Sequence, residues 1–243
     1  MKIGNWKSKI ENVRAFTLIE LLVVISIIGL LAAFTVPVLG QLKRQQYLKT
    51  ARAEMEFIQT ALENYKAKYG AYPPGNANPA GTYPQPLTNS MLPQLYYELA
   101  GTVQTTIGNN NYFQTLDGSA SILVTSVNTA YGVGGFLNCT KGTGEDDLKA
   151  KNFLTGIRQQ DVNNQTTNKT VITTVLVTSV GGPDQSYLNA LAAQNLGGNP
   201  FRYVYPGVNN PNGYDLWVQL VIKGKTNLLC NWNRQVQINA PLP

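Results

Sequence analysis

The chain has 243 residues, a formal net charge of +6 and no histidine. The lack of histidine excludes histidine acid/base catalysis, Ser-His-Asp and Cys-His nucleophile systems, and histidine-ligated metals. Charged residues make up only 13% of the chain, and Asn, Thr and Gly are abundant after residue 75, a composition typical of an extracellular, loop-rich surface. The length allows one membrane helix and one globular domain.

Residues 1–15 form a short basic leader, with four basic residues against Glu11 and hence a net charge of +3. A basic N-terminus ahead of an apolar helix predicts that the leader is cytoplasmic and that the rest of the chain lies across the membrane. The leader accounts for half of the excess positive charge and the remainder is scattered, so we expect no nucleic-acid partner.

An apolar run follows, with no charged residue from Leu21 to Leu42. At ~1.5 Å per helical residue, this run is long enough to cross a bilayer core of about 30 Å, which predicts a transmembrane helix over residues 16–42. Glu20 is a lone carboxylate at the rim of the run. An ionisable group there is costly and indicates a functional partner; the alternative is a glutamate that reaches the lipid headgroups.

A secretory signal peptide is cut after its apolar region, whereas here the polar leader comes first and the apolar run continues into the next helix. This order, with Phe16-Thr-Leu-Ile-Glu20, resembles the type IV prepilin family. The resemblance implies that prepilin peptidase cuts between Ala15 and Phe16 and methylates the new amine of Phe16. It also implies that Glu20 pairs with the amine of a neighbouring subunit during assembly. The family usually has Gly where this chain has Ala15.

Pro37 lies inside the predicted helix, where a proline removes one backbone hydrogen bond and bends or loosens the helix. The resemblance implies a point at which the helix melts during filament packing. An ordinary kink at the membrane surface is the alternative.

Residues 43–70 predict an amphipathic helix that packs on a globular domain. Charged residues such as Arg52, Glu54 and Glu63 are expected on its wet faces, and Gly70 is expected just past its end. A coiled-coil dimer is the competing interpretation of the apolar positions. These recur at helical spacing, at Leu48, Ala51, Met55, Ile58, Leu62, Tyr65 and Tyr69.

Two further patches resemble the major pseudopilin of type II secretion: Ala61-Leu-Glu-Asn-Tyr-Lys leading to Gly70-Ala-Tyr-Pro, and Gly198-Asn-Pro-Phe followed by Tyr214-Asp-Leu-Trp. The resemblance implies an α+β, type IV pilin-like fold. Its long N-terminal helix, transmembrane in the first half, packs on a small C-terminal antiparallel sheet. Strands are expected at Phe201–Tyr205, Tyr214–Ile222 and Arg234–Ile238.

The head is expected over residues 71–243, with an insertion at about 75–197 on the outer surface of the filament. Within the insertion we expect a short helix near Met91–Leu99 and strands at Ile122–Val127 and Val171–Val180. Residues 142–147 and 163–168 are expected to be solvated loops.

Cys139 and Cys230 are the only cysteines. Outside the cytoplasm they could form a disulfide; two unpaired buried thiols are the alternative. The resemblance also implies a calcium site, because the family binds calcium in a loop near its C-terminus. Here the chain has no carboxylate after Asp215, and Glu145-Asp-Asp147 lacks regular ligand spacing. We therefore expect no metal or other cofactor.

These observations predict a structural subunit, not an enzyme: a type II secretion pseudopilin of the bacterial inner membrane, single-pass, with a periplasmic head. Its expected partners are other copies of itself, prepilin peptidase, minor pseudopilins and the inner-membrane assembly platform. The alternatives are a type IV pilin of a surface pilus, for adhesion, motility or DNA uptake, and, more remotely, a membrane-tethered hydrolase.

Overall fold

The computed structural model describes residues 17–75, 93–140, 149–167, 171–182 and 199–239, with the backbone alone described for 34–41, 165–167 and 171–172. The chain divides into two units, Met1–Gln45 and Gln46–Pro243. Each unit is described by itself.

The long helix α1 spans Leu18–Tyr69. It ends as expected at Gly70, whose φ of 78° lies in the left-handed region that glycine adopts without steric cost. The Gly70 N–H donates to the Lys66 carbonyl at 2.8 Å. Gly70 therefore caps the C-terminus of α1, and its N–H closes the last turn.

The part of α1 within the second unit buries the predicted apolar face. Ala51, Met55, Ile58, Leu62 and Tyr65 are each at most 3% exposed and belong to the main hydrophobic core. The 3.6-residue period of an α-helix places these positions on one side. Because the chain's own head covers that side, core packing is confirmed and the coiled-coil alternative is not needed.

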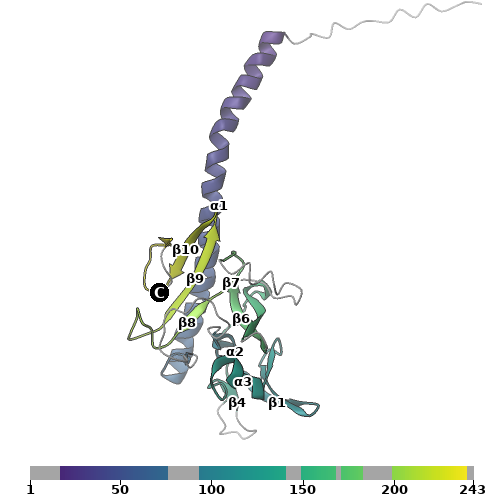
Figure 1. Ribbon diagram of the computed structural model, residues 1–243, viewed down its shortest axis with the longest axis vertical. Coiled ribbons are helices and arrows are strands. Elements are labelled where there is room, and N and C mark those ends of the chain that lie inside the picture. Colours follow the sequence, from purple (N-terminus) through teal and green to yellow (C-terminus); the bar gives the residue numbers. More distant parts are fainter. Residues whose placement is uncertain (1–16, 76–92, 141–148, 168–170, 183–198, 240–243) are drawn as a thin grey trace, which may run out of the picture. The chain divides into compact units, whose positions relative to one another are not determined.

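The C-terminal sheet is antiparallel, with strand order β11-β10-β9-β8. Leu216, Val218 and Leu220 of β9 pack in the same core as the α1 face, and Figure 1 shows these strands beside the C-terminal part of α1. The strands are β8 (Arg202–Val204), β9 (Asp215–Ile222), β10 (Lys225–Cys230) and β11 (Gln237–Ile238).

Sequence reasoning located β8 and β9 but missed β10. The expected last strand, Arg234–Ile238, shrinks to Gln237–Ile238. β9 and β10 are joined by Lys223 and Gly224 alone, with φ values of 51° and 72°. Two consecutive positive φ values are typical of a type I′ hairpin turn, which matches the twist of the flanking strands. The hairpin was not predicted from the sequence because Lys223 occupies the first turn position, where Asn, Asp or Gly is usual.

A second sheet has the order β3-β2-β1-β4, antiparallel except for the parallel pair of β1 and β4. The expected short helix is α2, and the strand expected over Ile122–Val127 is wrong in its second half, where α3 begins at Val124. The helical turn puts Val127, Ala130 and Tyr131 on one buried face, so packing overrides the β-branched propensity. The elements are α2 (Leu95–Ala100), β1 (Thr102–Ile107), β2 (Asn110–Thr115), β3 (Ser121–Leu123), α3 (Val124–Tyr131) and β4 (Cys139–Thr140).

The third sheet has the antiparallel order β5-β6-β7, preceded by a 3₁₀ turn, η2 (Gln159–Asp161). The strand expected at Val171–Val180 is confirmed as β6, Val171–Thr178. The solvated loop expected at 163–168 is wrong, because β5 (Val162–Thr167) pairs with β6 along its whole length. β5 is a polar edge strand, which carries no apolar alternation to reveal it.

The short strand β7 (Asn199–Pro200) joins the third sheet to the C-terminal one. The Asn199 side-chain amide donates to the Val180 carbonyl at 3.3 Å and to the Gln219 carbonyl at 2.8 Å. Leu95, Tyr97 and Leu176 share one core with Leu62 of α1. The described part of residues 75–197 is thus built into the head of an α+β fold.

Candidate assembly segment

The N-terminus of α1 is closed by a reciprocal pair, Thr17 and Glu20. Glu20 Oε2 accepts the Thr17 backbone N–H and the Thr17 hydroxyl, both at 2.8 Å. The Thr17 Oγ1 in turn accepts the Glu20 N–H at 3.3 Å. This is a capping box, in which the N-cap side chain and the third helical residue satisfy each other's free N–H groups.

The pattern Thr-x-x-Glu was visible in the sequence, although our sequence reasoning considered Glu20 only for partners outside its own chain. Figure 1 draws α1 in purple at this end. The carboxylate is exposed. A glutamate here therefore has a local role in the single chain and leaves its outer side open to a further partner.

The described residues after the cap expose large apolar side chains on all sides of the helix. Leu18 and Ile19 are 82% and 70% exposed, and Leu21, Ile25, Ile28 and Leu31 remain 58–60% exposed. In a soluble domain one helix face is normally polar. This segment has no polar face, so it requires an apolar environment that its own unit does not provide.

No helix within the described part of the chain has both the length and the apolar character to cross a membrane. Residues 34–41, inside the uncharged run of the sequence, are described for their backbone only. Pro37 is one of them and lies within α1. Ala15 and Phe16, the expected cleavage and methylation residues, lie outside the described residues.

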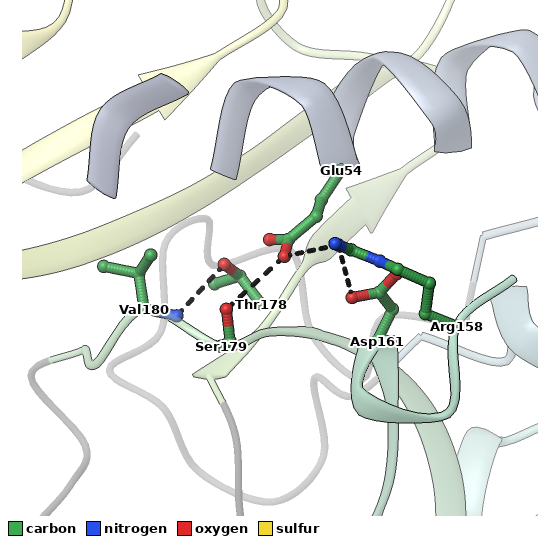
Figure 2. Close-up of polar contacts among 6 residues, drawn as sticks. All are labelled: Glu54, Arg158, Asp161, Thr178, Ser179 and Val180. Atoms are coloured by element: carbon green, nitrogen blue, oxygen red, sulfur yellow. Dashed lines mark hydrogen bonds and ion pairs between the residues drawn. The ribbon is translucent and has the colours of Figure 1, made fainter. Parts of the chain in front are cut away.

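A second candidate cluster joins the second-unit part of α1 to the segment before β5. Glu54 was expected on a wet face of the helix, but its side chain is only 2% exposed, so that expectation is wrong. Its Oε1 accepts a hydrogen bond from Arg158 Nη2 at 2.9 Å, and Arg158 also binds Asp161 through two nitrogens at 2.7 and 2.8 Å. Figure 2 shows Glu54 between this pair and the Thr178–Ser179 end of β6.

Burial raises the pKa of Glu54, and the negative charge of Asp161 adds to that rise, whereas the Thr178 hydroxyl and Arg158 lower it. The cluster lines one side of a groove of about 540 Å³ that also includes Lys49 and Phe57. Arg158 is 54% exposed and forms ion pairs with the carboxylates of both Glu54 and Asp161. The arrangement fastens the segment before β5 to the second-unit part of α1.

A second buried carboxylate, Glu98 on α2, was also missed. It is fully buried and accepts the N–H groups of Leu137 and Asn138 at 2.8 and 3.0 Å and the Tyr65 hydroxyl at 3.1 Å. Burial raises the pKa of Glu98, and these three donors oppose the rise. No local sequence pattern indicates this site, because its donors lie far away along the chain.

The expected disulfide is not formed: Cys139 and Cys230 are both free, buried thiols. Cys139 packs in the main core, whereas Cys230 belongs to a separate cluster with Trp217 and Leu228. The alternative of two unpaired thiols therefore describes the structure. Sequence spacing could not decide this, because a disulfide requires a specific Cβ···Cβ approach.

Among the described residues, no group of three or more Cys, Asp or Glu side chains could hold a metal ion. Glu145-Asp-Asp147 lies outside the described residues.

Residues 11–36 match the family model of the prokaryotic N-terminal methylation motif. The match covers the end of the leader from residue 11, the capping box of Thr17 and Glu20, and the exposed apolar segment that follows. The N-terminal part of the chain therefore resembles that of type IV pilin-like proteins.

Over 58 residues the chain is 41% identical to "Type II secretion system core protein G" of Pseudomonas aeruginosa, a stretch that is 24% of this chain. The chain thus spans 41% of that relative's length. No solved structure matched the chain. Together the two matches support the pilin-like, pseudopilin class, as the sequence motifs predicted.

Proposed function

We propose that the protein is the structural subunit of a type II secretion pseudopilus. The observation that carries the proposal is an apolar helix, exposed on all sides, that begins at the Thr17–Glu20 cap inside a methylation motif. Water is a poor solvent for that helix, because each Leu, Ile or Val left exposed forgoes about 1.5–3 kcal/mol of burial free energy. Lipid first, and then neighbouring copies, provide the apolar surroundings.

In this proposal the precursor sits in the inner membrane with its basic leader in the cytoplasm. Prepilin peptidase cuts between Ala15 and Phe16 and methylates the new amine. The inner-membrane assembly platform and minor pseudopilins then start a filament whose core is the bundled apolar helices. Pro37 loosens the helix as the copies pack together.

Glu20 sets the register between copies. Its carboxylate pairs with the amine of Phe16 in the neighbouring subunit, in surroundings of low dielectric where an unpaired charge is costly. The capping box holds the Glu20 side chain at the helix end, and the exposed side of its carboxylate is open to that amine. The outer surface of the filament is formed by the α+β head.

Mass spectrometry of the membrane-extracted protein tests the processing step. We expect a chain that begins at Phe16 and carries one methyl group on its amine. A mature chain that begins downstream of Ala33, or one that keeps its leader, would contradict the proposal.

The second candidate is a type IV pilin of a surface pilus, since the methylation motif alone suits both. The similarity to core protein G favours the pseudopilus. A strain without this protein should lose export of folded proteins across the outer membrane and keep its surface pili; the reverse result would favour the pilus. Neighbouring genes for a secretin and companion pseudopilins would support secretion, and a retraction ATPase would support a pilus.

A further inference from the structure

The loop between β8 and β9 is closed by a carboxylate. Asp215 is fully buried at the start of β9. Its Oδ2 accepts the N–H groups of Val208 and Asn209 at 2.9 and 2.8 Å and the Asn209 side-chain amide at 3.0 Å. Its Oδ1 accepts the Asn210 N–H at 3.0 Å. Internal donors thus fill the acceptor positions of Oδ2 and take one of those of Oδ1, so the loop's own N–H groups satisfy the Asp215 carboxylate without a cation.

The connection after β9 also lacks the features of a cation loop. Ile222 pairs directly with Lys225, so the turn contains only Lys223 and Gly224. Calcium requires six to eight oxygen ligands, usually several carboxylates. The sequence has no Asp or Glu after Asp215; instead Lys223 lies in this turn and Lys225 begins β10.

We propose that the C-terminal sheet of this head closes without a divalent cation. Internal N–H donors hold the loop before β9 through Asp215, and a type I′ turn joins β9 to β10 directly. The resemblance to major pseudopilins implies calcium near the C-terminus, and the residues present here do not fit it. The inference concerns the head alone, so it holds whether the filament is a pseudopilus or a pilus.

Thermal unfolding of the full chain in detergent micelles tests the proposal. Near-ultraviolet circular dichroism would follow Trp217 and Trp232, which pack against each other beside β10. We expect the same melting temperature in calcium chloride and in EDTA. A higher melting temperature with calcium, or a lower one with EDTA, would overturn the proposal.

Two variants locate the source of the closure. Asp215→Asn places an amide among N–H donors, and Gly224→Ala puts a side chain at a φ of 72°. Both should lower the melting temperature by an amount that does not depend on calcium. Gly134→Ala is the control, because its Cβ meets nothing within 4 Å and its φ is ordinary. If calcium restored either variant to the wild-type melting temperature, cation-free closure would be refuted.

Discussion

Glu98 and Asn138 are joined by two hydrogen bonds, and Asn138 is the donor in both. The Asn138 backbone N–H donates to Glu98 Oε2 at 3.0 Å, and the Asn138 side-chain amide donates to the Glu98 carbonyl oxygen at 2.6 Å. Tyr69, at the end of α1, donates its hydroxyl to Asn138 Oδ1 at 2.7 Å. The pair therefore connects α2, the residue just before β4 and the long helix through buried and partly buried polar contacts.

Asn138→Ala should lower the free energy of unfolding of the head by about 2–4 kcal/mol. The change leaves the Glu98 carbonyl oxygen, the Lys151 N–H and the Tyr69 hydroxyl without their partner, and each buried unsatisfied group carries a desolvation penalty. Urea unfolding followed by tryptophan fluorescence measures the loss. Asn128→Ala, at an exposed position of α3, is the matched control and should cost less than about 0.5 kcal/mol.

Arg158→Met should destabilise the head by about 1–2 kcal/mol, because it leaves the buried Glu54 carboxylate without its cation. Arg158 is half-exposed, so solvent screening keeps the loss below that of a fully buried pair. Glu54→Gln combined with Arg158→Met should recover part of it. A double-mutant cycle with no coupling between the two positions would show that the ion pair does not fasten the segment before β5 to α1.

The stability of the head should fall as the pH rises above the ordinary glutamate pKa of 4.5. Burial raises the pKa of both Glu54 and Glu98, so the folded state binds more protons than the unfolded state between that value and the raised ones. The pKa of Asp117 is lowered instead, so its effect on stability is confined to pH values below its ordinary pKa of 3.8. Urea unfolding over a pH series checks the slope. Glu54→Gln should reduce it, and a rise in stability through this window would contradict the expectation.

The parts of the fold that follow from local pattern were predictable. The apolar face of α1 repeats at helical spacing, and Gly70 followed by Pro73 marks its end, so both helix and cap could be stated before the structure. β6 and β9 are likewise rich in β-branched and apolar residues. In each case neighbouring residues carry the signal.

The parts that depend on distant residues were not predictable. Glu54 looks like a surface residue until Arg158 and Ser179, more than a hundred positions away, are brought to it. Val124–Tyr131 includes residues with strand propensity. It folds as a helix because that conformation buries Val127, Ala130 and Tyr131 on one face against the core. For the candidate site, the position of Glu20 was predictable, and its capping partner, although local, was overlooked.

Ala15→Leu should leave the precursor uncut, because a small residue precedes the expected cleavage site. Immunoblots of membrane fractions should show a single slower band, and Ala33→Leu, well past the site, should be processed like the wild type. Normal processing of Ala15→Leu would place the cut elsewhere.

The central claim is that neighbouring copies of the chain bury the apolar helix and that the charge of Glu20 fixes their register. Glu20→Gln separates this role from helix capping, because glutamine still accepts the Thr17 N–H in a capping box but carries no charge. Electron microscopy of cells that make this variant should show no filaments, although the protein is still inserted in the membrane. Filaments of normal number and length in Glu20→Gln would contradict the account.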